Sequence, residues 1–176
     1  MRVQPIIQLN AEETRLAVEE GRAAVERVKA MNLKDYTVEI DTLKAHQMGC
    51  AAEIAVCNYL GVQWGKHGMD GRFRGDASLC EVRCIRNVYR QHLLLLNERD
   101  LQKLHRPYVH VVSLGNQQFK LSGWAYGHEV VRDENIFNHA KFVEKIWRLQ
   151  VESLRCITEL KQLFEEGELW KESSPI

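Results

Sequence analysis

The chain has 176 residues, of which 45% are apolar and 27% charged, and its 24 basic side chains balance 24 acidic ones. This length is sufficient for one domain with its own core, and the composition excludes a disordered chain. No apolar run is long enough to span a bilayer and no secretory signal is visible, so we expect a cytoplasmic protein with no membrane partner.

The distribution of charge indicates the kind of partner, and the cysteine content indicates the redox state of the thiols. Residues 61–128 hold 10 basic and 5 acidic side chains, whereas residues 1–60 and 129–176 are net acidic. A positive centre favours a polyanionic partner, because phosphate contacts by Lys and Arg supply most non-specific affinity; an uneven solvated surface is the alternative. The five irregularly spaced cysteines indicate reduced thiols.

The N-terminal segment predicts a long amphipathic helix. Asn10 is at the cap position and Glu13 three residues later, which is a capping-box pattern. The apolar residues that follow have helical spacing. We expect this helix to pack against the core or against a second copy, which makes a homodimer possible.

A second helix is predicted over about residues 42–60, ended by Gly61. Its middle consists of small residues, which allow a helix to approach a sheet closely. Glu53 lies among them. A carboxylate in such a patch must be paired, hydrated or bound to a cation, unless it lies on the solvated side of the helix.

The rest of the chain predicts strands with a short helix among them and a long helix at the end. The strand segments are "LCEVRCI", "HLLLLN", "YVHVVSL", "FKLSGWAYG" and "EKIWRL". The helical segments are "NERDLQKLH" and "VESLRCITELKQLFEE". The expected fold is α/β, a mixed β-sheet sandwiched by helices. We divide the chain into an N-terminal helical extension (1–42), a core (43–164) and a C-terminal tail (165–176).

The stretch "GDASLCEVRC", residues 75–84, has an unusual strand pattern. Side chains alternate across a strand, so the cysteines and Val82 face one side, while Glu81 and Arg83 face the other. Asp76 lies just upstream. Two carboxylates at a sheet edge, with a third from the Glu53 helix, suit Mg²⁺ or Mn²⁺, which prefer oxygen ligands. A surface salt bridge between Glu81 and Arg83 is the alternative.

The order Asp-x4-Glu-x-Arg, as Asp76, Glu81 and Arg83, resembles the PD-(D/E)XK nuclease motif in its E-x-R variant. The segment "GCAAEIAV", with Glu53, is similar to the first core helix of that family. The order of elements also matches, and "PYVHVVSL" with "FKLSGWAYGHEV" resembles the paired strands of small phage-type members. The resemblance covers about residues 43–164.

This resemblance implies a restriction-endonuclease-like core, DNA as the substrate and metal-dependent phosphodiester hydrolysis in the cytoplasm, that of the host if the chain is phage-encoded. Asp76 and Glu81 would be metal ligands, helped by the Val82 carbonyl. Glu53 would bind a second metal or a metal-bound water. The cofactor would be Mg²⁺ or Mn²⁺, which lowers the pKa of bound water and neutralises phosphate charge.

The sequence departs from the family pattern at two positions. Arg83 replaces the usual lysine, and an arginine cannot act as a general base because its pKa lies above about 12. It can still hold the scissile phosphate through two hydrogen bonds and stabilise developing charge. Gly75 stands where a proline often precedes the aspartate.

Further basic and aromatic residues flank this stretch. We expect phosphate contacts from arginines and base stacking from one tyrosine, at Arg74, Arg86, Tyr89 and Arg90. A loop of solvated charges is the alternative for each of them. Three functions are therefore open: a nuclease, a nucleic-acid-binding or assembly module with weak or no cleavage, and a structural protein held by a salt-bridge network.

Overall fold

The computed structural model describes residues 4–30, 42–65, 80–86, 92–137 and 145–168, with the main chain alone for 92–97 and 99. The helices are α1 (Ala11–Ala30), α2 (Thr42–Leu60), α4 (Gly127–Val130) and α5 (Ile157–Glu165), with 3-10 turns η1 (Glu98–Lys103), η2 (Asp133–Asn135) and η3 (Val151–Ser153). The strands are β1 (Ile6–Gln8), β2 (Glu81–Ile85), β3 (His92–Asn97), β4 (Pro107–Gly115), β5 (Gln118–Tyr126) and β6 (Ile146–Gln150).

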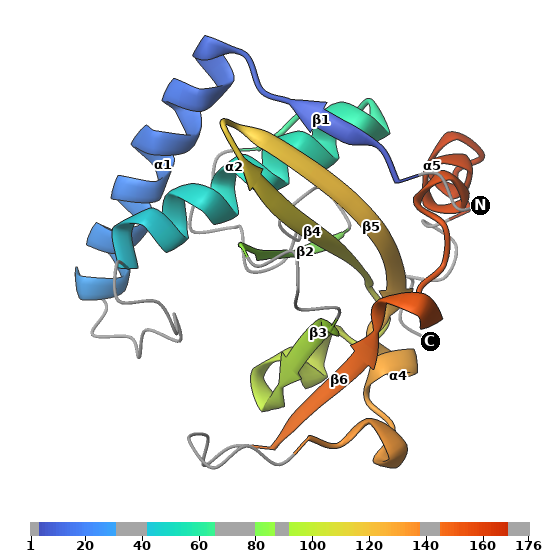
Figure 1. Cartoon of the computed structure of the whole chain (residues 1–176). Helices are drawn as coiled ribbons and strands as arrows, with labels where there is room; N and C mark the ends of the chain where they lie inside the picture. Colours follow the sequence, from blue (N-terminus) through green and yellow to red (C-terminus); the bar gives the residue numbers. More distant parts are fainter. Residues whose placement is uncertain (1–3, 31–41, 66–79, 87–91, 138–144, 169–176) are drawn as a thin grey trace.

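Four strands form a mixed sheet in the order β1-β5-β4-β2, and β3 pairs with β6 in a separate two-stranded sheet (Figure 1). β2 and β4 are parallel, whereas β4, β5 and β1 are antiparallel neighbours. A parallel pair requires a crossover connection, which here contains β3 and η1. The predicted α/β class with a mixed sheet is confirmed.

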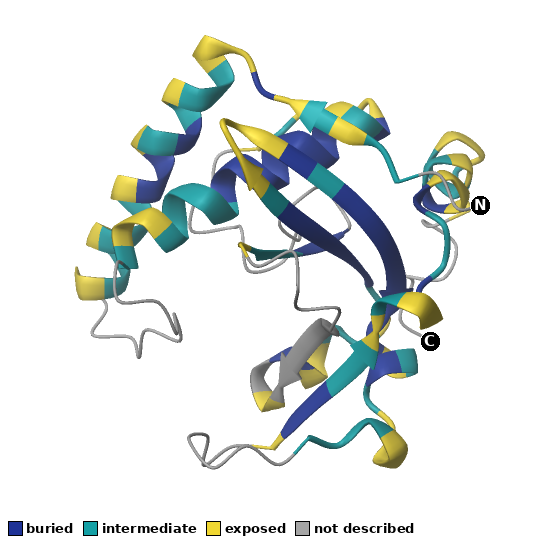
Figure 2. Ribbon diagram, viewed as in Figure 1, coloured by how far each residue is buried: buried dark blue, intermediate teal, exposed yellow. Residues whose placement is uncertain are grey.

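The sheet has a different cover on each face. Helices α2 and α5 pack on one face, in a core cluster that includes Val109 and Trp124. The next residues along the same strands, Tyr108 and Ala125, point to the opposite face and pack with Trp147 of β6. Burial is continuous along the middle of β4 and β5 (Figure 2). Helices therefore cover one face, and the crossover and the β3–β6 pair lie on the other.

The N-terminal segment contributes a strand as well as a helix. The predicted capping box is confirmed: Glu13 N donates to Asn10 Oδ1 at 2.9 Å, and Asn10 N donates to Glu13 Oε2 at 2.8 Å. The strand β1 was not predicted, because three residues are too few to show a period of two. It pairs with β5, so the segment preceding α1 is part of the main sheet.

The closing helix is shorter than the sequence predicts. Residues 151–153 form η3, and α5 begins only at Ile157. Between them, Arg155 exchanges two backbone hydrogen bonds with Trp124 of β5, at 2.8 and 3.2 Å. Gly123 allows this approach, because a Cβ there would lie 2.6 Å from the Arg155 carbonyl oxygen. An extended segment that docks on a sheet edge cannot also be helical.

The structure also bears on the predictions about the cysteines and about membrane-spanning segments. All five cysteines are free thiols, as expected. Within the described residues, no helix combines the length and apolar character needed to cross a membrane.

Helix α1 crosses α2 at a glycine. A Cβ at Gly21 would lie 2.6 Å from Gln47 Cγ and 2.7 Å from the Gln47 backbone N and Cα. Because backbone atoms cannot swing away as a side chain does, the two helices would have to separate. At Gly49 of α2, by contrast, no described atom outside the surrounding turns of its own helix lies within 4 Å of the position of the missing Cβ.

We therefore expect alanine at Gly49 and alanine at Gly21 to change the free energy of unfolding in opposite directions. Gly49→Ala should raise the free energy of unfolding by up to about 1 kcal/mol, because alanine is the better helix former. Gly21→Ala should lower it by about 1–3 kcal/mol, because the crossing is overpacked. Urea denaturation of both variants tests this, and a stabilised Gly21→Ala protein would show that the close crossing is not formed.

Candidate functional site

The strand β2 carries a buried carboxylate on the face away from the helices. Cys80 and Val82 join the core under α2, as the alternation predicts, and Glu81 and Arg83 point to the opposite face. Their neighbours in the parallel register on β4 are Tyr108 and His110, respectively. β2 is the last strand in the order, so this polar face lies at one end of the described sheet.

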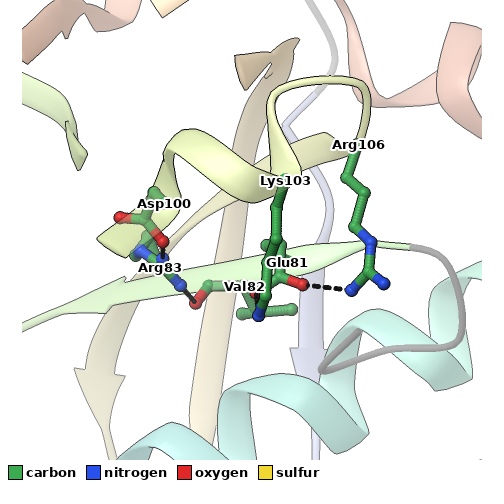
Figure 3. Close-up of polar contacts among 6 residues, drawn as sticks. All are labelled: Glu81, Val82, Arg83, Asp100, Lys103 and Arg106. Carbon is green, nitrogen blue, oxygen red and sulfur yellow. Dashed lines mark hydrogen bonds and ion pairs between the residues drawn. The ribbon is translucent and has the colours of Figure 1, made fainter. Parts of the chain in front are cut away.

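Glu81 is ion-paired with two basic residues of the crossover. Its side chain is 2% exposed; Lys103 Nζ donates to Oε2 at 2.9 Å, and Arg106 Nη1 donates to Oε1 at 2.7 Å. Figure 3 shows the main chain of both residues on the side of β2 away from α2, with their side chains extending from it toward Glu81. The sequence alternative, a surface salt bridge between Glu81 and Arg83, is wrong: the carboxylate is buried and has other partners.

Arg83 is fixed by three different contacts. Its Nη2 donates to Asp100 Oδ1 at 2.6 Å, and its Nη1 donates to the Val82 carbonyl at 3.1 Å (Figure 3). The guanidinium also lies over the Tyr108 ring, 5.2 Å from the centroid. Because Asp100 is in η1, Arg83 links the central part of β2 to the crossover segment.

The residues after η1 are fastened to the end of β5. Gly127 N donates to the Arg106 carbonyl at 3.1 Å, and His128 N donates to the Leu104 carbonyl at 2.9 Å. A Cβ at Gly127 would lie 2.7 Å from Leu104 Cα, so only glycine permits this contact. These bonds set the position of the main chain that carries Lys103 and Arg106.

The cations keep Glu81 ionised. Burial alone would raise the pKa of this carboxyl, but the charge and hydrogen bond of Lys103, the charge of Arg83 and the hydrogen bond of Arg106 outweigh it. The pKa of Glu81 is therefore held below the ordinary value of 4.5. The Glu81 carboxylate is therefore charged at neutral pH, and its oxygens are of the kind that can coordinate a hard metal ion.

His110 lies beside Arg83 and is completely buried. In the described structure neither of its ring nitrogens has a hydrogen-bond partner. Burial, together with the charge of Lys120, lowers the pKa of His110 from 6.5 to about 4. The imidazole is therefore neutral at pH 7, so His110 adds no positive charge next to the cations around Glu81.

Glu53 is in α2, on the other side of the sheet from the Glu81 cluster. It is 9% exposed, and Trp64 Nε1 donates to its Oε2 at 3.2 Å. Burial and then the Glu53 charge raise the pKa of Cys57 to about 12. The alternative that placed Glu53 on the solvated side of its helix is wrong, and no described contact joins it to Glu81.

Several predicted site residues cannot be placed. Asp76, Arg74, Tyr89 and Arg90 lie outside the described residues. Arg86 follows β2 directly and is exposed, as a phosphate contact requires. Within the ranges that the structure describes, no three His, Cys, Asp or Glu side chains gather as a metal site would require.

The sequence analysis did not identify the partners of Glu81 and Arg83. Asp100, Lys103 and Arg106 follow one another at intervals of three. In a 3-10 helix, side chains at i and i+3 eclipse one another, so this spacing is a signal for Asp100 and Lys103 within η1, whereas Arg106 lies beyond the end of η1.

Comparisons with protein-family models, with curated proteins and with solved structures found no match for this chain. The candidate site therefore rests on the geometry of its own residues.

The buried ion pairs predict the stability of one variant. Glu81→Gln removes the charge that two cations share, so the free energy of unfolding should fall by about 3–5 kcal/mol at pH 7. Because the folded pKa of Glu81 is lowered, its contribution is complete above pH 4.5 and is lost as the pH falls through the folded value. The difference between wild type and variant should therefore shrink in acid.

Urea denaturation between pH 3 and pH 7 measures this difference. Glu19→Gln is the control, because the Arg15–Glu19 pair is 60% and 52% exposed. Its removal should cost less than about 0.5 kcal/mol. Equal losses in the two variants would contradict the buried position of Glu81.

His110 predicts a second pH dependence. A histidine whose pKa is lowered stabilises the fold fully above its unfolded value of 6.5, and the contribution is lost as the pH falls toward 4. Wild type should lose about 2–3 kcal/mol between pH 6.5 and 4.5. His110→Leu should remove this loss, whereas a change at the exposed His105 should not. Parallel pH profiles for wild type and His110→Leu would refute the expectation.

Proposed function

We propose that this chain is a metal-dependent nuclease that hydrolyses DNA phosphodiester bonds. The observation that supports this most strongly is the ionised Glu81 carboxylate, buried at the start of β2 and surrounded by Lys103, Arg106 and Arg83. It lies in the same short stretch as Asp76, and the cations around it have the charge that a phosphodiester requires.

The energetic cost of this cluster supports a function beyond folding. Removing charges from water costs several kcal/mol per ion, and well-packed apolar residues often stabilise a protein equally well. The chain nevertheless places Glu81 and Asp100, which are 2% and 5% exposed, within reach of three basic side chains. Clusters of buried, ion-paired charges of this kind are found at functional sites.

A divalent cation fits Glu81 in part. An ionised carboxylate is the oxygen donor that Mg²⁺ or Mn²⁺ prefers. Glu81 would hold the ion together with Asp76, which lies outside the described residues. Glu53, which lies on the α2 side of the sheet and accepts a hydrogen bond from Trp64, is not included in this site. When bound, the ion supplies an activated water and neutralises charge on the phosphate.

The chain's own residues would orient the substrate around that site. Lys103 and Arg106 now donate to the two Glu81 oxygens, and a cation at Glu81 would take over this neutralising role. The other proposed DNA contacts are Arg86, Arg74, Tyr89 and Arg90. The parallel β2–β4 pair, with α2 behind it and a crossover in front, is compatible with a restriction-endonuclease-like core, which we include in the proposal.

A second candidate is a nucleic-acid-binding or assembly module with weak or no cleavage. One specific observation favours it: both Glu81 oxygens already accept hydrogen bonds from cations, and Arg83 cannot release a proton. Such a module would use the same basic surface without activating water. A homodimer remains a prediction for either candidate.

The decisive measurement is cleavage of supercoiled plasmid and of single-stranded DNA with Mg²⁺ or Mn²⁺. We expect metal-dependent cutting by wild type, abolished by EDTA. Glu81→Gln should reduce the rate at least about 100-fold, because even outer-shell changes at metal sites cost 10–100-fold. Glu19→Gln, purified identically, should cut like wild type.

The outcomes separate the candidates. Cutting that survives in folded Glu81→Gln would place the activity elsewhere or in a contaminant. DNA binding without cutting would support the binding module. A wild-type protein that neither cuts nor binds DNA would leave the salt-bridge network with a structural role only.

A further inference from the structure

We infer that Lys103 is the residue that contacts the phosphate of bound DNA, and that Arg83 is a positioning residue that holds η1 in place. This inference rests on the proposed nucleic-acid function and deepens it. The resemblance to the nuclease motif implies instead that Arg83 holds the phosphate, because it stands where that motif has lysine. The contacts of the two side chains support the opposite division of roles.

Arg83 cannot leave its present partners without a large loss. Its closest contact is Asp100, which is only 5% exposed. If the guanidinium moved to a phosphate, the buried Asp100 carboxylate would lose this hydrogen-bonded charge, which is costly in the protein interior. The Tyr108 ring beneath the guanidinium further restricts its movement.

Lys103 is free of this restriction. Its ammonium group has three donors and, in the described structure, uses one of them on Glu81. The side chain is 29% exposed, whereas Glu81 is 2% exposed, so Lys103 connects the buried acid with the solvent. If Lys103 turns toward an anion, Arg106 still holds the Glu81 carboxylate at 2.7 Å.

The anchoring of the crossover gives Lys103 a defined position. The Arg83–Asp100 pair holds η1 against β2, and the backbone bonds to Gly127 and His128 hold the residues that follow. Lys103 lies between these two attachments. A phosphate that approaches the outer side of Glu81 would therefore meet the ammonium of Lys103 before the more deeply buried Arg106, which is 12% exposed.

The test measures DNA binding without metal, so that it reports on the side chains alone. A fluorescein-labelled duplex is titrated with protein in EDTA at several NaCl concentrations, and fluorescence anisotropy gives the dependence of log K on log salt. Each phosphate contact contributes about 0.9 to this slope. Lys103→Met should reduce the magnitude of the slope by about 0.9, and Lys103→Arg should restore it.

Lys161→Met is the matched control. Lys161 also lies near one carboxylate, Glu165 at 4.0 Å, and is 40% exposed, but it belongs to α5 on the other face of the sheet. Its removal should leave the slope unchanged. Arg83→Gln should lower the thermal midpoint while the slope of the folded protein stays that of wild type. If Lys103→Met does not fold, Lys103→Gln gives the same comparison, because it keeps a donor for Glu81.

The results separate this inference from the proposed function. If wild type binds DNA and the folded Lys103 variants keep its full slope, the inference is wrong whether or not the protein cuts. If instead the slope of log K against log salt falls by about 0.9 in Arg83→Gln, the roles of the two residues are reversed and the inference is again wrong. If wild type binds no DNA at all, the nucleic-acid function itself fails, and the assignment of Lys103 with it.

Discussion

The structure around β2 depends on one constraint: the charge of Glu81 lies inside the protein. Transfer of a carboxylate from water to the interior is too costly unless cations and hydrogen bonds replace the lost water. Lys103 and Arg106 meet this requirement only if the crossover returns over β2. The path of the chain between two parallel strands is therefore coupled to the ionisation of a single side chain.

The same strand serves two purposes through its two faces. Small side chains on one face, such as Cys80 and Val82, let the small residues of α2 approach closely. The other face carries Glu81 and Arg83 and has no helix of comparable length above it in the described structure. Because side chains alternate along β2, the five residues of this strand provide close apolar packing on one face and charged groups on the other.

Local patterns were predictable, and long-range partners were not. The capping box at Asn10 and Glu13 and the alternation along β2 depend on residues at most three positions apart, so the sequence contains all the information needed. The partners of Glu81, by contrast, are 22 and 25 residues away. Their proximity depends on how the crossover folds, which no local period encodes.

The missed elements have the same cause. β1 exists because β5 offers a neighbouring strand, and the late start of α5 follows from the pairing of Arg155 with Trp124. In both cases tertiary contacts decided the conformation of a segment whose own pattern is weak or helical. Predictions that rest on propensity alone fail where a sheet edge competes for the same backbone groups.

Arg83 and Lys103 carry charged groups of different chemistry, which matters for any anion site at this edge of the sheet. Arginine forms a planar, permanently charged fork, which suits a fixed pair with Asp100 better than repeated exchange between partners. Lysine is a compact charge on a flexible stem and can change partners by rotation. Under the proposed nucleic-acid function, a cation that can change partners suits the contact with phosphate, and a rigid one suits the contact that fixes the crossover. The Lys103 and Arg83 side chains are almost equally exposed, at 29% and 25%, and differ instead in their contacts: Lys103 is paired with Glu81, whereas Arg83 contacts Asp100, the Val82 carbonyl and the Tyr108 ring.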